Sequence, residues 1–174
     1  TAVEIAPFLA YCRTASKKEF NGDVLITGIG LTATTYHLAK QIAIKKPDFI
    51  LQAGVGGCFN TAMKLGSVVA VKQDTIADQS VVELNQLKSL FNLQMVPHNQ
   101  YPFKKGWLVN GNTFFIKKTK LKQVKAISVN EITTSKKKIA FYEEIFNPVI
   151  ESMEGAALHY VCLMEKIPFL QIRS

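Results

Sequence analysis

The sequence predicts an α/β fold, a three-layer α/β/α sandwich in which helices cover both faces of a central β-sheet. Two observations predict it. Short apolar segments of strand character alternate with segments of helical spacing along the 174 residues, and two of the apolar segments run into glycine-rich turns. The sequence contains neither an internal repeat nor an interdomain linker, and a chain of this length commonly forms one core. We therefore expect a single domain over residues 1–174.

The first part of the chain predicts a helix followed by a strand, a tight turn and a second helix. Helical spacing runs from Val3 to Cys12, and Val24 to Thr27 is an apolar, β-branched run typical of a strand. Gly28 to Gly30 then supplies a tight turn, and the next helix ends before Pro47, which cannot continue it. The core-facing residues expected in that helix are Leu31, Thr35, Leu38 and Ile42.

A second strand and glycine turn repeat this arrangement. Phe49 to Gln52 is a short apolar run that enters the turn Ala53 to Gly57. We expect this strand to lie parallel to Val24 to Thr27, with the intervening helix as the crossover. Ser67 to Lys72 is a further strand of high β propensity. From residue 74 to residue 111, prolines and amide side chains predict long loops with short helix or strand pieces.

Regular alternation returns in the last third of the chain. Strands are predicted at Ala126 to Val129, at Val149 to Ser152 and at Phe169 to Ile172. Helices are predicted at Lys136 to Glu144 and at Gly155 to Glu165. This alternation completes the prediction of a sheet covered on both faces.

Both ends of the domain are expected to be incomplete. The sequence opens directly on a helical pattern, where an α/β fold of this kind has a preceding strand, and it ends on a strand at Ser174 with no helix to cover it. We expect a few residues before the first helix, and at least a loop and a helix after the last strand.

The composition predicts a soluble globular protein rather than a membrane or exported protein. Apolar residues make up 48% and charged residues 20%, and no apolar run approaches the roughly 18 residues of a membrane helix. No export signal opens the sequence. Cys12, Cys58 and Cys162 lie far apart, which suits a reducing compartment, so a cytoplasmic location is expected.

The formal charge of +8 does not predict nucleic-acid binding. Arg13 and Arg173 are the two arginines among 21 basic residues, although arginine is the residue that reads guanine edges and clamps phosphates. The lysines cluster at Lys117 to Lys125 and at Lys136 to Lys138 without interleaved aromatics. Such runs are typical of solvated surfaces.

The glycine turns exclude two common phosphate-binding motifs. The first turn lacks both the third glycine and the later acidic residue of a dinucleotide site, and neither turn carries the Gly-Lys-Ser/Thr of a P-loop. His37, His98 and His159 stand at unrelated positions, which gives no metal-ligand cluster. No cofactor and no metal are expected. The turns either bring the backbone close to a ligand or simply join strands to helices.

Three motifs together resemble the purine nucleoside phosphorylase and nucleosidase superfamily, from one end of the chain to the other. They are Val24 to Gly30, Ala53 to Gly57 with Leu65 to Val69, and Ser152 to Ala157 in the segment Glu-Ser-Met-Glu-Gly-Ala-Ala. Within that superfamily the chain is most similar to the futalosine hydrolases. The resemblance implies a nucleoside phosphorylase-like fold with a mixed sheet.

The resemblance also implies an activity. The expected reaction is hydrolysis of the N-glycosidic bond of futalosine, with water as co-substrate, to hypoxanthine and dehypoxanthine futalosine in menaquinone biosynthesis. The alternatives are a 5′-methylthioadenosine/S-adenosylhomocysteine nucleosidase, a purine nucleoside phosphorylase, and a non-catalytic nucleoside- or nucleic-acid-binding module.

Two glutamates are the expected catalytic residues. Cleavage of a purine riboside gives the sugar oxocarbenium character, which a carboxylate can stabilise through the sugar hydroxyls. By the resemblance, Glu154 binds the 2′- and 3′-hydroxyls while Met153 packs under the sugar, and Glu4 on the first helix is the general base for water. The alternatives are that Glu154 only favours a helix start and that Glu4 is a solvated surface residue.

The purine is expected to lie against the second glycine turn and a threonine pair. The resemblance places Val55 and Gly56 close to the nucleoside, and Thr133 and Thr134 where the family contacts the base. The adenine-type enzymes carry Phe-Ile there, so this departure favours a 6-oxopurine, unless these are ordinary loop threonines. The acid that protonates the purine would follow Ser174.

Arginine usage favours hydrolysis over phosphorolysis. Phosphorylases of the superfamily hold phosphate with arginines, and neither Arg13 nor Arg173 lies within a glycine turn. Related enzymes close the pocket with an aromatic residue from a partner subunit. Phe103 is the candidate for that residue, so a homodimer or larger homo-oligomer is expected.

Overall fold

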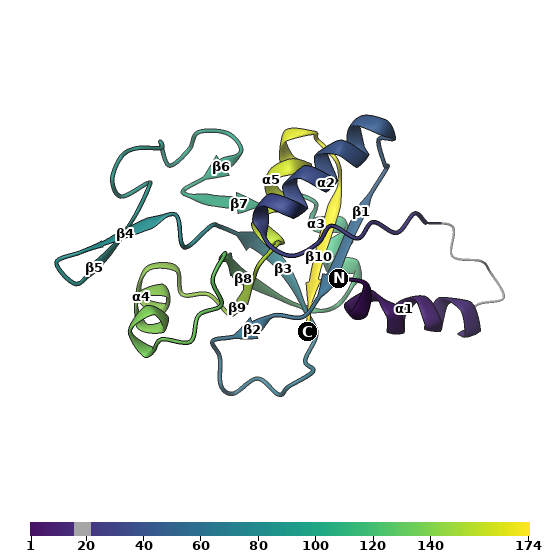
Figure 1. The fold of residues 1–174 in the computed structure, drawn as a ribbon, viewed down its shortest axis with the longest axis horizontal. Coiled ribbons are helices and arrows are strands. Elements are labelled where there is room, and N and C mark those ends of the chain that lie inside the picture. Colours follow the sequence, from purple (N-terminus) through teal and green to yellow (C-terminus); the bar gives the residue numbers. More distant parts are fainter. Residues whose placement is uncertain (16–21) are drawn as a thin grey trace.

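The chain folds as three layers, with helices on both faces of a mixed sheet (Figure 1). The structure, a computed structural model, describes residues 1–15 and 22–174. The helices are α1 (Ala2–Ala15), α2 (Leu31–Ile44), α3 (Thr113–Lys118), α4 (Lys136–Phe146) and α5 (Gly155–Met164). The predicted α/β sandwich with a mixed sheet is confirmed.

The strands fall into one large sheet and one separate hairpin. Within the described residues, eight strands form the sheet, in the central order β1-β10-β3-β8-β9-β2, with β7 on β3 and β6 on β7. The strands are β1 (Ile50–Gly54), β2 (Gly57–Cys58), β3 (Val69–Asp74), β6 (Phe103–Lys104), β7 (Trp107–Val109), β8 (Lys122–Ser128), β9 (Ile150–Ser152) and β10 (Phe169–Arg173). Strands β4 (Ser80–Glu83) and β5 (Gln86–Ser89) form the hairpin.

Both parallel and antiparallel pairs build the sheet. β1 runs parallel to β10, and β3 runs parallel to β8, as β8 does to β9. β10 is antiparallel to β3, and β2 is antiparallel to β9. The sheet therefore contains two parallel blocks of opposite direction, β1 with β10 and β3 with β8 and β9, which meet between β10 and β3, while β2, β6 and β7 are attached by antiparallel pairs.

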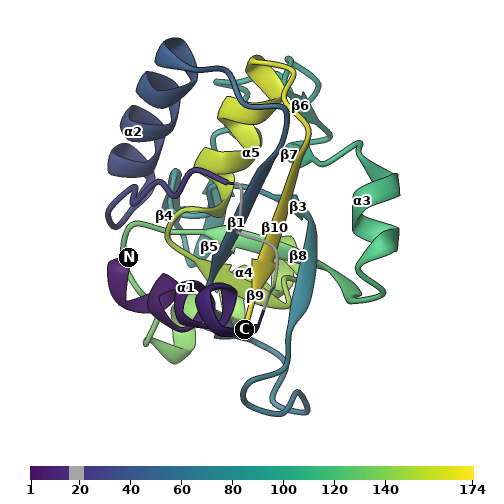
Figure 2. The ribbon, with the colours of Figure 1, turned by 90° about the vertical axis from the view of Figure 1, so that its right-hand side faces the viewer.

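Apolar side chains attach the helices to opposite faces of the sheet (Figure 2). On one face, Leu38 and Ile42 of α2 and Leu158 of α5 form a buried cluster with Phe169 of β10. On the other face, Ile116 of α3 packs with buried residues of β3 and β10. Burial of these side chains, each contributing about 1.5–3 kcal/mol, holds the three layers together.

The sheet curls back on itself at the second glycine turn. Gly56 donates its amide to the carbonyl of Ser174 at 2.9 Å, while Gly57 pairs with Glu151 of β9. A Cβ at Gly56 would lie 2.7 Å from Cγ2 of Ile150 and 3.6 Å from Cβ of Arg173. Glycine is therefore required where the ends of β9 and β10 approach each other.

Most of the predicted elements are confirmed within a few residues of their expected ends. The exceptions lie before α2. Residues 22–28 form no strand, and the side chains of Val24, Leu25 and Ile26 are exposed. The predicted strand at Val24 to Thr27 is therefore wrong, as is its parallel pairing with β1, because β1 pairs with β10 and no described strand lies beside the apolar run. In α2 the buried threonine is Thr34, one position before the predicted Thr35.

Candidate active site

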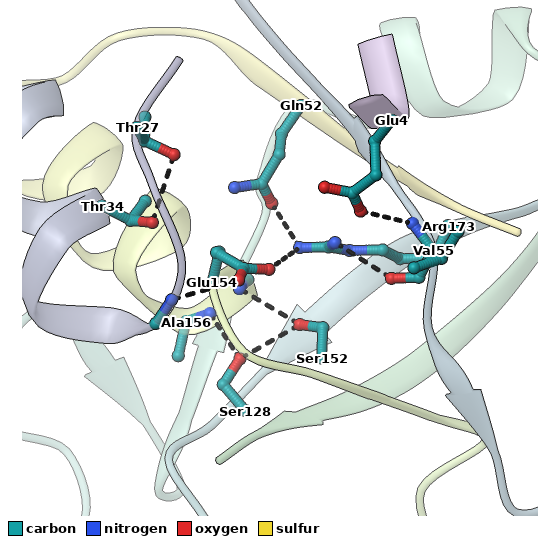
Figure 3. A network of polar contacts seen from close by, with 12 residues as sticks. Glu4, Thr27, Thr34, Gln52, Val55, Ser128, Ser152, Glu154, Ala156 and Arg173 are labelled. Carbon is teal, nitrogen blue, oxygen red and sulfur yellow. Dashed lines mark hydrogen bonds and ion pairs between the residues drawn. The ribbon is translucent and has the colours of Figure 1, made fainter. Parts of the chain in front are cut away.

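Arg173 lies at the centre of a group of polar side chains drawn from four segments of the chain (Figure 3). It is the last residue of β10 and only 2% exposed. Its Nη1 donates to the carbonyl of Val55 at 3.2 Å, and its Nη2 donates to Oε1 of Gln52 at 3.0 Å and to Oε2 of Glu154 at 3.3 Å. These bonds hold the guanidinium against the second glycine turn.

Glu154 joins β9 to α5 and points its carboxylate toward Arg173 and the first glycine turn. Oε1 accepts a hydrogen bond from the amide of Gly30 at 3.2 Å, and the side chain is 18% exposed. Although Glu154 is the N-cap residue of α5, its carboxylate makes no capping bond. The carboxylate of Glu154 therefore bonds Gly30 and Arg173 and does not cap the helix.

Two serines satisfy the amino-terminal amides of α5 in place of Glu154. Ser152 Oγ accepts from the amide of Gly155 at 3.1 Å, and Ser128 Oγ accepts from the amide of Ala156 at 2.7 Å. Exposed amides at a helix start require such acceptors. The serines leave the carboxylate of Glu154 available for a ligand.

Glu4 approaches the same place from α1. Its Oε1 accepts a hydrogen bond from the amide of Val55 at 3.2 Å, and its Oε2 accepts one from the hydroxyl of Thr1 at 2.8 Å. Partial burial raises the pKa of Glu4, whereas the hydrogen bonds from the Thr1 hydroxyl and the Val55 amide lower it. Glu4 is therefore ionised at neutral pH and able to accept a hydrogen bond.

Gly54 leaves the space that brings Glu4 and Arg173 together. A Cβ at this position would lie 2.6 Å from Nη1 of Arg173 and 3.1 Å from Oε1 of Glu4. Any larger residue would separate the two groups. Figure 3 shows the guanidinium of Arg173 lying between the carboxylates of Glu4 and Glu154. Such an arrangement can bind hydroxyl groups and orient a water molecule.

The structure brings some of the other predicted site residues to this place. Val55 and Gly56 belong to the turn that contacts Arg173 and Glu4, and the half-buried Met153 directly precedes Glu154. Thr133 is half-buried and donates its amide to Oε1 of Glu151 at 2.9 Å, whereas Thr134 is exposed. All of these residues remain predictions as nucleoside contacts.

Phe103 packs inside its own chain. Its ring lies 5.1 Å from that of Phe91 and 6.2 Å from that of Tyr160, measured between centroids. It also packs against a buried cluster that includes Leu31 and Ala156, at the starts of α2 and α5. Its predicted role in a partner's pocket stays a prediction.

A buried polar group lies beneath the start of α5. Asp74 is fully buried, and its Oδ1 accepts from Ser128 Oγ at 2.9 Å. Burial raises the pKa of Asp74 to about 6, although the Ser128 hydroxyl and the charge on Arg173 act in the opposite direction. Burial also lowers the pKa of His159 to about 4, and its Nδ1 contacts the carbonyl of Leu108 at 2.9 Å. His159 is thus a packed core residue.

The described residues hold no group of three or more His, Cys, Asp or Glu side chains placed to bind a metal ion. Cys58 and Cys162 are free thiols, and burial raises the pKa of Cys162 to about 12. Across residues 1–15 and 22–174, no helix is long and apolar enough to pass through a membrane.

Arg173 is the site residue that the sequence reasoning missed. Along the sequence, neither arginine lies within a glycine turn. In the folded chain, however, Arg173 donates to Val55 of the second turn. The position of Arg173 at the end of an apolar strand could have indicated a site residue, because strand ends and glycine turns meet at ligand sites in α/β folds. The side chain of Arg13 lies outside the described residues.

Comparison with known proteins identifies the family and several relatives. The family model of the phosphorylase superfamily matches residues 17–174 of this chain. The 5′-methylthioadenosine/S-adenosylhomocysteine nucleosidase of Buchnera aphidicola subsp. Schizaphis graminum is 23% identical over 177 residues, covering 92% of this chain and 68% of that protein.

Solved structures share the fold. The 5′-methylthioadenosine/S-adenosylhomocysteine nucleosidase of Colwellia psychrerythraea 34H, in complex with adenine, gives a TM-score of 0.75 at 21% identity, covering 100% of this chain and 78% of that one. A futalosine hydrolase mutant of Helicobacter pylori strain 26695 gives 0.67 at 19% identity, covering 85% and 66%. The chain thus spans about two thirds of the length of several relatives that it matches.

Proposed function

The chain belongs to the phosphorylase superfamily, and from that premise we propose that it is a nucleosidase, a hydrolase that cleaves the N-glycosidic bond of a purine nucleoside. One observation carries the proposal. The guanidinium of Arg173 lies between the carboxylates of Glu4 and Glu154, at the turn that contains Val55. Glycoside hydrolysis needs carboxylates that can stabilise the sugar and position a water, and Glu4 and Glu154 are proposed to supply them.

Glu154 is proposed to bind the ribosyl group. Its two oxygens already accept hydrogen bonds from Gly30 and Arg173, which fix the carboxylate in place. Accepting further bonds from the 2′- and 3′-hydroxyls would stabilise positive charge as it develops on the sugar. Met153, directly before it, supplies an apolar contact under the ring.

Glu4 is proposed to activate the water. An ionised carboxylate is a weak base toward neutral water, so the first role of Glu4 is to orient the water through a hydrogen bond. The water becomes acidic only as it attacks a sugar of oxocarbenium character, and the carboxylate then accepts its proton.

The charges of the site favour water over phosphate as the nucleophile. Glu4 and Glu154 bring two negative charges against the one positive charge of Arg173, whose Nη atoms are already bonded to Val55, Gln52 and Glu154. A phosphate dianion would meet repulsion from Glu4, and displacing the bonds of Arg173 would cost further. Hydrolysis is therefore favoured over phosphorolysis.

We propose futalosine as the substrate, cleaved to hypoxanthine and dehypoxanthine futalosine. The support is the Glu-Ser-Met-Glu-Gly-Ala-Ala segment and the threonine pair Thr133 and Thr134 in place of an adenine-type Phe-Ile. Similarity to 5′-methylthioadenosine/S-adenosylhomocysteine nucleosidases supports a second candidate, hydrolysis of those 6-aminopurine nucleosides.

Base release tests the proposal. The full-length protein is incubated with futalosine, methylthioadenosine and inosine, with and without inorganic phosphate, and the free base is quantified by chromatography. We expect release without phosphate. Glu154→Gln keeps the shape of the side chain but removes its charge, so we expect turnover to fall by more than about 10-fold.

Lys45→Gln is the matched control, because Lys45 is an exposed charge paired with Asp23 at the far end of α2. It should leave turnover unchanged. Strict dependence on phosphate would overturn the claim of hydrolysis, and normal turnover by Glu154→Gln would remove Glu154 from the mechanism.

A further inference from the structure

We propose that Glu151 is the residue that reads the purine, accepting a hydrogen bond from N1–H of a 6-oxopurine while Thr133 donates to O6. The inference rests on the proposed nucleosidase function and adds the base class that the site selects. Nothing in the catalytic arrangement of Glu4, Arg173 and Glu154 uses Glu151.

The first observation is a buried carboxylate with one oxygen free. Glu151 is 7% exposed, and its Oε1 accepts from the amide of Thr133 at 2.9 Å. Its Oε2 is buried and has no hydrogen-bond partner among the described residues, and the same holds for Oγ1 of Thr133. A buried polar atom without a partner is costly, so native proteins rarely retain one without a ligand or water to satisfy it.

A third unpartnered polar atom lies nearby. The hydroxyl of Tyr142 is buried without a partner, and its pKa is raised by burial first and then by the carboxylates of Asp78 and Glu151. An acceptor on Glu151 and hydroxyl groups on Thr133 and Tyr142 therefore gather around one loop. This combination matches a ligand that carries both a donor and an acceptor.

Glu151 is also close to the ribosyl site. It precedes Glu154 by three residues, and in the sheet it pairs with Gly57 of the second glycine turn. A Cβ at Gly57 would lie 3.7 Å from Cβ of Glu151, so the glutamate lies directly beside this turn. A purine attached to a ribose on Glu154 can therefore extend toward Glu151.

The chemistry of the two groups distinguishes the base classes. A 6-oxopurine presents N1–H as a donor and O6 as an acceptor, which fits a carboxylate oxygen and a threonine hydroxyl. A 6-aminopurine presents a lone pair at N1, which would face the negative charge of Glu151. A site built around a hydrogen bond rejects analogues that cannot form it, because its own buried groups then stay unpaired.

Binding requires a small shift of residues 130–135, since Glu151 Oε2 is sealed from solvent in the structure. These residues have no helix or strand, and Ile132 is 65% exposed. The loop is held to Glu151 through Thr133 and to Asp78 through the Asn130 amide at 2.5 Å. We expect a purine edge to reach Oε2 when this loop moves while the bond from the Thr133 amide to Oε1 and the Asn130 anchor are kept.

Two matched pairs of nucleosides test the inference, namely futalosine with its 6-amino counterpart, and methylthioinosine with methylthioadenosine. The readout is the ratio of kcat/KM for the 6-oxo over the 6-amino member of each pair. We expect Glu151→Gln to lower this ratio by about 100-fold or more, because the new amide donates to N1 of a 6-aminopurine and its oxygen still accepts from Thr133. Glu154→Gln is the control, and it should lower kcat/KM for both members of each pair by a similar factor.

Equal losses for both members in Glu151→Gln would overturn the inference, as would a preference of the unaltered chain for 6-aminopurines. Calorimetric binding of hypoxanthine and adenine to the unaltered chain is a second measurement that does not depend on folding of the variant. Tighter binding of hypoxanthine supports the inference, and equal or tighter binding of adenine overturns it. Absence of base release from all four nucleosides would instead contradict the nucleosidase function, while the binding measurement would still test Glu151.

Discussion

Arg173 shows how a single buried side chain organises the site. Its guanidinium is bonded to a backbone carbonyl, an amide side chain and a carboxylate, which are contributed by Val55, Gln52 and Glu154. Burial lowers the pKa of Arg173, whereas the charges of Glu154, Asp74 and Glu4 raise it. The buried cation is thus compensated by carboxylates, as buried charges must be.

A first prediction concerns the shape of that cation. Arg173→Lys keeps the charge but cannot present two Nη atoms in the geometry that Val55 and Gln52 require. We expect kcat/KM to fall by about 100-fold, since small displacements of an oriented site are costly. Steady-state kinetics on the best nucleoside measures it, with circular dichroism to verify folding. Activity within about 3-fold of the unaltered chain would show that charge alone suffices.

A second prediction concerns Gly155. A Cβ at this position would lie 2.2 Å from both Oδ2 of Asp74 and Nε2 of Gln171, which are buried and cannot retreat. We expect Gly155→Ala to lower the free energy of unfolding by about 1–3 kcal/mol, the range for overpacked cores. Gly111→Ala is the control, because nothing lies within 4 Å of its Cβ. Urea denaturation measures the free energy of unfolding of both variants, and equal values would contradict the clash.

Individual residues also show where sequence reasoning succeeds and fails. The sequence nominates Glu4 and Glu154, and the structure brings them to one guanidinium. It does not nominate Glu151, because a glutamate on a short strand has no local mark of burial. Only the pairing with Gly57 and the bond from Thr133 reveal its position. Local patterns identify residue types, whereas contacts distant in sequence identify neighbours.

At the scale of elements, a helix whose pattern lies within one segment of the sequence is predicted correctly. Helix α2 is recognisable from its own 3.6-residue spacing, and α5 from its apolar run after Ser152. The strand predicted at Val24 to Thr27 failed because a strand needs a hydrogen-bonding neighbour, which no local pattern supplies. The opposed directions of β3 and β10 were unpredictable for the same reason.

The start of α5 gives a third prediction. Ser128 Oγ accepts from the amide of Ala156 and donates to Asp74, so Ser128→Ala leaves a buried amide and a buried carboxylate each without a partner. We expect the free energy of unfolding to fall by about 2–4 kcal/mol. Ser135→Ala is the matched control, because Ser135 precedes α4 without making a side-chain cap bond. Chemical denaturation of both variants compares them, and similar losses would show that Ser128 is not a structural cap.

At the scale of the whole molecule, one polar group connects distant parts of the fold. Asp74 ends β3, Ser128 ends β8, and Gln171 belongs to β10, while Gly155 begins α5 above them. The two parallel blocks of the sheet and the helix layer therefore meet at a buried carboxyl. Protonation of Asp74 should therefore change the free energy of unfolding of the whole domain.

The pH dependence of unfolding tests this connection. Burial raises the pKa of Asp74 from 3.8 to about 6, so the folded state holds the proton more tightly than the unfolded chain does. The stability that Asp74 contributes is therefore fully present below about pH 4, and it is lost as pH rises toward 6. This difference in pKa between the folded and unfolded states corresponds to about 3 kcal/mol in the free energy of unfolding.

Asp74→Asn isolates this effect, because asparagine keeps an oxygen for Ser128 and carries no titrating proton. His159, whose pKa is lowered to about 4, titrates in the opposite sense in the same range, but it is common to both chains and cancels in their difference. We expect the stability of Asp74→Asn relative to the unaltered chain to rise by about 3 kcal/mol in total between about pH 3 and pH 7, with about 2 kcal/mol of the rise between pH 4 and pH 6, and then to stay constant. Urea denaturation at half-unit steps of pH measures it. A difference that is flat over this range would mean that Asp74 is ionised in the folded protein and that Arg173 compensates it.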